Sequence, residues 1–195
     1  MTLIAKRIPN GYSWTLVTRL GDMLAKAEHA YGRRDQSYTL LGIEFREEDP
    51  QIWYPGNCGH IAIQITTDVI NDMPMACYQL AHECVHLLSP TGERVVNAFE
   101  EGLATYFAHK YVQEEFGRYV PDSYASYAAA KNLVAELLAL DSDAVKVLRR
   151  VEPTISKITA EQITVAYPSL NPATAAALAA PFEREAGGIQ LAHAQ

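Results

Sequence analysis

Two histidines separated by three residues, His82 and His86, constrain this chain more than any other feature. On a helix, residues at i and i+4 project from the same face one turn apart, so both imidazole rings can reach a single ion. Glu83 directly follows the first histidine. The segment therefore predicts a helix that offers two neutral nitrogen ligands to a zinc ion and a carboxylate close enough to take a proton from water.

A catalytic zinc site needs a third protein ligand, which we seek on the next expected helix. The segment from Asn97 to Tyr106 carries two adjacent carboxylates, Glu100 and Glu101. Neighbouring helix residues point about 100° apart, so only one of the two can face the metal. The residues around Glu101 are too apolar for an exposed helix face, which favours a role inside the fold.

Taken together, these two segments resemble a known family. Glu-Gly-Leu-Ala-x-Tyr at 101–106 after His-Glu-x-x-His is similar to segments of zinc aminopeptidases and thermolysin-like gluzincins, and the resemblance covers residues 78–106. In that family the glutamate before the glycine is the third zinc ligand, which implies Glu101. The resemblance also implies a zinc-dependent metallopeptidase that cleaves peptide bonds through a zinc-bound water, with Glu83 as general base. One departure is Thr105, where thermolysin-like enzymes often carry an aspartate.

Enzymes of this superfamily hold the oxyanion with zinc and one further donor, commonly a tyrosine or a histidine. Several such residues follow Glu101 in this chain: Tyr106, His109, Tyr111, Tyr119, Tyr124 and Tyr127. We rank Tyr124 and Tyr127 first as catalytic candidates, because they lie where the helix beyond the ligand helix is expected to begin. Tyr78, one turn before His82, is expected to pack against the site.

Other interpretations stay open. The same scaffold can serve a non-enzymatic or inactive interaction protein, or a zinc amidohydrolase that acts on a non-peptide amide. Peptide deformylases use a cysteine upstream of a His-Glu-x-x-His helix as third ligand, but Asn57-Cys58-Gly59 does not resemble their segment, so we expect Cys58 to be a turn residue. Zinc held only for structure needs no base, so the presence of Glu83 favours an enzyme.

Composition narrows the possible partners. The chain has 195 residues, 49% of them hydrophobic, enough for one core or two small facing lobes. A net charge of −7 without a basic run argues against nucleic acid as a partner. A peptide or protein substrate is what the resemblance to the gluzincins implies. We expect no membrane association, because no segment reads as a signal peptide or a membrane span. Three cysteines, an odd number, suit the cytoplasm.

Periodicity predicts an α+β fold. The expected elements are a helix at 12–31, an antiparallel meander of strands at 38–45, 52–54 and 60–66, the motif helix, and helices at 94–116, 122–140, 143–150, 160–167 and 172–182. Asn71 or Asp72 should cap the motif helix, with Pro74 in its first turn, and this helix should stop near Ser89. Thr159 and Gln162 form a candidate capping box.

The resemblance gives these elements an architecture. It implies a zincin-like fold, in which a small antiparallel sheet with backing and active-site helices is followed by a mostly helical C-terminal subdomain. We expect one catalytic domain over 1–195, with an upper α+β subdomain at 1–90, a helical lower subdomain at 91–185 and a flexible tail at 186–195. In that family an edge strand pairs with the extended substrate, and residues 60–66 are expected to be that strand.

Overall fold

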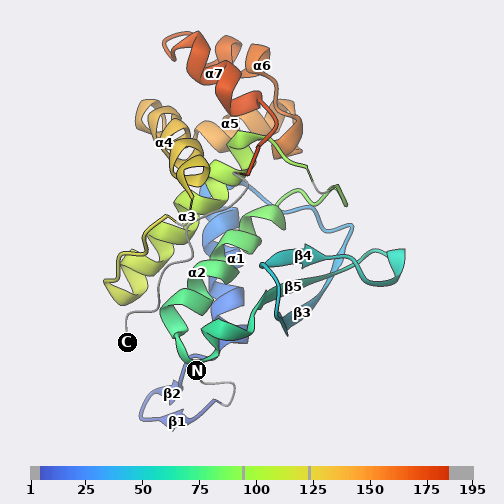
Figure 1. Ribbon diagram of the computed structural model, residues 1–195, viewed down its shortest axis with the longest axis vertical. Helices are drawn as coiled ribbons and strands as arrows, with labels where there is room; N and C mark the ends of the chain where they lie inside the picture. Colours follow the sequence, from blue (N-terminus) through green and yellow to red (C-terminus); the bar gives the residue numbers. More distant parts are fainter. Residues whose placement is uncertain (1–4, 94, 123, 185–195) are drawn as a thin grey trace. The chain divides into compact units, whose positions relative to one another are not determined.

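The structure is a computed structural model that describes residues 5–93, 95–122 and 124–184 and is mixed α+β (Figure 1). The chain divides into two compact units, Met1–Gly92 with Phe107–Val120, and Glu93–Tyr106 with Pro121–Gln195. Helix α3 (Ala98–Phe116) contributes its first half to the second unit and its second half to the first. The expected tail at 186–195 lies outside the described residues.

The first helix of the first unit, α1 (Leu16–Tyr31), begins four residues later than predicted. A capping box at Thr15 and Thr18 starts it, because each side chain accepts a hydrogen bond from the other residue's backbone N–H. The residues before it form a short antiparallel hairpin of β1 (Arg7–Ile8) and β2 (Gly11–Tyr12), which the periodicity did not reveal. Trp14, which lies within the helix range predicted from the sequence, precedes α1 and is exposed.

The three-stranded sheet is mixed, so the predicted antiparallel meander is wrong. The strands are β3 (Thr39–Arg46), β4 (Gln51–Trp53) and β5 (His60–Thr66), in the order β3-β5-β4. β5 enters between the other two and runs parallel to β3 and antiparallel to β4. The chain turns back from β4 to β5 through the short 3-10 helix η1 (Pro55–Asn57).

The expectation that residues 60–66 form an edge strand is also wrong, because β5 is the central strand. Its residues Ile61, Ala62 and Ile63 are all buried, so both of its faces are covered. A run of consecutive buried residues is typical of a strand inside a sheet. The edges are β3 and β4, and the three-residue length of β4 suits an edge.

Helix α2 (Met73–His86) carries the histidine motif, as predicted. Asp72 caps it by accepting a hydrogen bond from the Met75 N–H at 3.1 Å, and Pro74 lies in its first turn, which confirms both expectations. The helix ends at His86, three residues earlier than expected, with Leu87 as its C-cap. α2 packs against α1 and β5 through a buried face formed by Ala76, Cys77, Leu80, Ala81, Cys84 and Val85.

The second unit is helical. It contains the first half of α3 together with α4 (Ala125–Leu140), α5 (Ala144–Val151), the 3-10 helix η3 (Ile155–Lys157), α6 (Ala160–Ala166) and α7 (Pro172–Ala179). The capping box of Thr159 and Gln162 at the start of α6 is confirmed. The predicted ranges hold within a few residues, except that α3 begins at Ala98 rather than 94.

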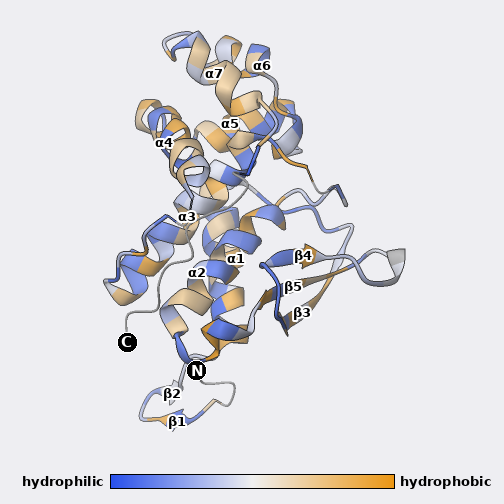
Figure 2. Ribbon diagram, viewed as in Figure 1, coloured by the Kyte–Doolittle hydropathy of each residue, from blue (hydrophilic) through white to orange (hydrophobic). Residues whose placement is uncertain are grey.

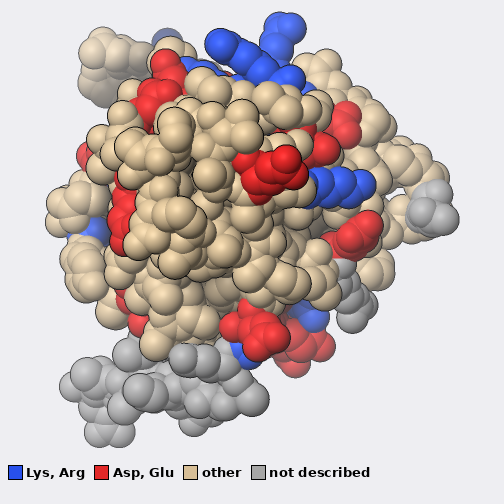
Figure 3. Space-filling view, turned by 90° about the horizontal axis from the view of Figure 1, so that it is seen from above, with Lys and Arg blue, Asp and Glu red and all other residues tan. Residues whose placement is uncertain are grey.

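Hydropathy and charge follow this arrangement. Figure 2 shows apolar residues along β3 and β5, a largely polar β4, and both apolar and polar residues on the helices. On the face drawn in Figure 3, acidic side chains form several separate groups with basic ones between them, in keeping with the net charge of −7. Among the described residues, no helix has the length and apolar character needed to cross a membrane.

Candidate metal site

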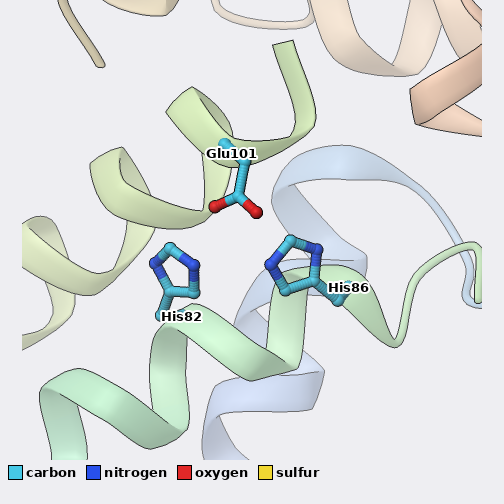
Figure 4. Close-up of side chains that lie close together, drawn as sticks. All are labelled: His82, His86 and Glu101. Atoms are coloured by element: carbon cyan, nitrogen blue, oxygen red, sulfur yellow. The ribbon is translucent and has the colours of Figure 1, made fainter. Parts of the chain in front are cut away.

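Three side chains that could hold a metal ion lie together in the structure. His82 and His86 project from α2, and Glu101 from the first turn of α3 points its carboxylate toward them (Figure 4). One ligand atom from each residue lies within 4.8 Å of those of the other two, and all three side chains are half-buried. Among the described residues, the three in this group are the same three that the sequence predicted as ligands.

The chemistry of this donor set fits zinc. Two imidazole nitrogens and one carboxylate oxygen are the protein ligands of many catalytic zinc sites, which leave a further position open. Ligand atoms around a tetrahedral zinc lie roughly 3.4 Å apart, given metal–ligand bonds of about 2.1 Å, so small side-chain rotations would close the group. The two imidazole rings lie 5.2 Å apart between centroids and 61° out of plane, and are therefore not stacked on each other.

Glu83, the candidate general base, is buried with 5% of its surface exposed. It lies on α2 directly after His82, the first candidate ligand, within the turn that spans the two histidines. A buried carboxylate is costly unless the surrounding structure compensates for it. Its position between the two candidate histidine ligands makes it a candidate for chemistry as well as for structure.

Glu100 behaves differently from Glu101. Its side chain is only 3% exposed and is not part of the group that could hold a metal. Its backbone N–H donates to Asn97 Oδ1 at 2.9 Å, which caps the first turn of α3. The two glutamates therefore have different surroundings on one helix, as their angular separation requires. The choice of Glu101 as ligand stays a prediction that a metal measurement has to test.

The first turn of α3 is fixed by contacts inside the second unit. Asn97 Nδ2 donates to the Ile155 carbonyl at 3.1 Å, and the Ala98 N–H donates to the Ala180 carbonyl at 2.8 Å. Thr105, fully buried, donates its hydroxyl to the Glu101 carbonyl at 2.9 Å. These bonds hold the backbone of Glu101 in place, which limits the positions its carboxylate can take.

Tyr124 and Tyr127, the candidate oxyanion donors, have contacts of their own in the second unit. The Tyr124 hydroxyl accepts a hydrogen bond from Arg184 at 3.0 Å, and the Arg184 guanidinium lies over its ring. The Tyr127 ring packs on Phe182 with centroids 4.8 Å apart. These contacts explain where both rings lie without involving the metal ligands. A catalytic role for either tyrosine stays a prediction.

Cys58 is not part of the candidate metal group. It lies directly after η1 in the turn that leads into β5, where its exposed thiol is 3.0 Å from His60 Nδ1. This matches the expectation of a turn residue.

One contact of a residue near the candidate ligands in sequence was not predicted. The Tyr78 hydroxyl lies 3.4 Å from His109 Nε2, although the two residues are 31 positions apart. The sequence spacing gave a partial indication of this contact. Tyr78 precedes His82 by one helical turn, and His109 follows Glu101 by about two turns. Nothing in the sequence, however, paired the two helices at this point.

Comparisons of the chain with protein-family models, with curated proteins and with solved structures give no match.

Proposed function

We propose that this chain is a zinc-dependent metallopeptidase of gluzincin type, with a zincin-like fold. The observation that carries the proposal is the group of His82, His86 and Glu101 together with a buried carboxylate, Glu83, in the same turn of α2. The order of the elements supports it, because a helix and a small sheet precede the histidine helix and the glutamate helix follows. The residues present fit zinc in number and type.

Zinc, when bound by these three residues, supplies Lewis acidity that lowers the pKa of water and polarises a carbonyl group. Glu83 accepts one proton from the attacking water. The oxygen of that water forms a new bond to the peptide carbonyl carbon. As the carbon–nitrogen bond breaks, Glu83 delivers the proton to the departing amine, so the base returns to its starting state. The burial of Glu83 keeps this proton away from bulk water.

Edge strand β4 is the proposed place for the substrate backbone. It lies on the outside of the sheet, and it packs near α2. An extended peptide can add to such an edge through backbone hydrogen bonds, which give affinity with little selectivity for side chains. This role replaces the one that the sequence had given to residues 60–66.

Two measurements on the wild-type chain test the proposal. Protein purified without added zinc should contain one zinc ion per chain by elemental analysis, or take up one from micromolar zinc. The zinc-loaded protein should then cleave members of a mixed peptide library, with the new termini read by mass spectrometry. A chain that binds no zinc has no such site, and a zinc-loaded chain that cleaves nothing points to an inactive scaffold or to a non-peptide amide as substrate.

The oxyanion donor is tested by removing single hydroxyl groups. Tyr124→Phe and Tyr127→Phe keep the ring packing that the structure shows and remove only the hydroxyl. The donor's variant should lose roughly 100-fold or more in kcat, as seen when a positioned oxyanion donor is removed. A tyrosine whose phenylalanine variant cleaves as fast as the wild type is not the donor.

A further inference from the structure

A cluster of three rings joins α2 to the C-terminal half of α3 in the first unit. The rings of Tyr78 and His109 meet edge to face with centroids 5.1 Å apart. The ring of Tyr119, which follows α3, lies 6.2 Å from that of His109. Tyr78 and His109 are half-buried, whereas Tyr119 is 70% exposed. The cluster therefore runs from the packed surface of two helices out to solvent.

Tyr111, also on α3, shows how a purely structural tyrosine is held in this unit. Its side chain is buried, and its hydroxyl donates to Asp22 at 3.0 Å and accepts from Arg19 at 3.3 Å. In the ring cluster, the Tyr78 hydroxyl lies 3.4 Å from His109 Nε2, and both of these residues, unlike Tyr111, keep exposed surface. The ring cluster thus has surface that a ligand can reach.

Helix geometry relates this cluster to the candidate metal ligands. Tyr78 precedes His82 by four residues on α2, so their side chains lie on one face, roughly 6 Å apart along the helix. An extended peptide advances about 3.3 Å per residue. A substrate held at the metal by its scissile carbonyl can therefore bring a side chain one or two residues away level with Tyr78.

We propose that Tyr78, His109 and Tyr119 form a subsite that binds an aromatic side chain of the substrate, next to the peptide bond that is cleaved. This inference depends on the proposed function. Aromatic rings favour edge-to-face and offset contacts with other rings, and the cluster already uses an edge-to-face contact between Tyr78 and His109. The exposed Tyr119 ring gives an incoming ring an apolar face to cover.

The test uses binding to the zinc-loaded full chain, so it does not depend on turnover. Three hydroxamates are compared by calorimetry, with a benzyl, a methyl or a carboxymethyl group beside the metal-binding group. The benzyl compound should bind about 10-fold more tightly than the methyl compound, since it buries a ring against other rings. Tyr119→Ala should reduce this advantage to about threefold or less. The same variant should keep its zinc and its affinity for the methyl compound.

Tyr12→Ala is the matched control, because Tyr12 is 68% exposed on β2 of the same unit. It should leave all three affinities unchanged. Equal binding of the benzyl and methyl compounds would overturn the subsite, and so would tightest binding of the carboxymethyl compound or an advantage that survives Tyr119→Ala. Zinc content, measured first, separates the two failures: a chain without zinc refutes the proposed function and the subsite with it, whereas a zinc-loaded chain without the benzyl preference refutes the subsite alone.

Discussion

Gly102 lies directly against the carbonyl group of Ala130 on α4. A Cβ atom at position 102 would stand 2.3 Å from the Ala130 carbonyl oxygen and 2.6 Å from its carbonyl carbon. No side chain fits at that distance, so the close approach of the two helices in the second unit requires glycine. The preceding residue is Glu101, the candidate ligand. The glycine of the Glu-Gly segment thus has a packing reason that is distinct from metal chemistry.

Gly102→Ala should therefore disturb both stability and metal binding. The added methyl group forces α3 and α4 apart, which should lower the free energy of unfolding by about 1–3 kcal/mol, as overpacking of a core does. Because the shift occurs beside Glu101, zinc should be lost to a chelator at a lower chelator concentration than in the wild type. Chemical denaturation and a zinc competition assay measure the two effects.

Gly21→Ala is the control for that change. Gly21 is exposed within α1, and a Cβ atom there would meet nothing within 4 Å. Alanine at an exposed helix position should stabilise the chain by up to about 1 kcal/mol. If Gly102→Ala proved as harmless as Gly21→Ala, the close contact with Ala130 would not constrain the fold.

Glu101→Ala should weaken zinc binding far more than Glu100→Ala. Loss of a direct ligand should exceed the 10- to 100-fold loss of affinity that is typical when a residue supporting a ligand is removed, so we expect roughly 100-fold or more. Glu100 is buried outside the metal group, so its alanine variant should lose stability but retain zinc. Zinc retention is compared at chelator concentrations where both variants are folded. Equal retention by the two variants would mean that Glu101 is not a ligand.

Asp72 should contribute stability that depends on pH. It caps α2 and accepts a hydrogen bond from Arg118 at 2.6 Å. Burial alone would raise the pKa of Asp72, but the hydrogen bonds from Arg118 and from the Met75 backbone outweigh it and hold the pKa below its ordinary value. The folded state then favours the charged form. Its stabilising effect is therefore present above about pH 4 and is lost as the pH falls through the lowered pKa.

Two variants separate the cap from the ion pair. Asp72→Asn keeps a capping oxygen and loses the charge, so it should cost less than about 1 kcal/mol at pH 7, because the pair with Arg118 is partly exposed. This difference from the wild type should shrink as the pH falls toward 2. Asp72→Ala also removes the cap and should cost about 1 kcal/mol more. A difference between wild type and Asp72→Asn that does not change with pH would exclude the ionic contribution.

Only one of the three cysteines should react in the folded protein. Burial raises the pKa of Cys77 to about 12 and that of Cys84 well above its ordinary value, whereas the Cys58 thiol is exposed. The thiolate is the reactive form, so a thiol reagent at pH 8 should label one thiol per native chain rapidly and all three after unfolding. Cys58→Ser should abolish the rapid phase. Rapid labelling of that variant would mean that the α2 core opens readily.

Local signals predicted much of this fold. Asp72 and Pro74 mark the start of α2, and Thr159 with Gln162 marks the start of α6, because caps depend on residues within one turn. The neighbours of a strand are not local in this sense. The sequence of β5 suits a strand at an edge as well as one between β3 and β4. In the structure Ala62 is buried beside two buried isoleucines, as expected of a central strand.

The residues of the candidate site also differ in how far local spacing predicted them. His82 and His86 are one turn apart on a single helix, so spacing alone placed them together. Glu101 came from the resemblance of its segment to the gluzincins, because nothing in the spacing from His86 brings α3 to α2. The contact of Tyr78 with His109 was not foreseen, because it joins residues 31 positions apart without a family motif to pair them.

Glu83→Gln is the decisive test of the proposed chemistry. Glutamine has nearly the shape of glutamate and can still form hydrogen bonds, but it cannot accept the proton of the attacking water. Zinc content and melting temperature should therefore stay near those of the wild type. Hydrolysis of any peptide that the wild type cleaves should fall by roughly 100-fold or more, the lower end of what a positioned general base contributes.

The control for this substitution is Glu114→Gln, which makes the same chemical change at an exposed position on α3. It should leave zinc content and the rate of cleavage unchanged. Because Glu83 is buried, its variant could also lose activity through local unfolding, and the unchanged zinc content and melting temperature exclude that cause. A Glu83→Gln variant that cleaves as fast as the wild type would show that another group takes the proton, and the proposed mechanism would then be wrong even if His82, His86 and Glu101 bind zinc.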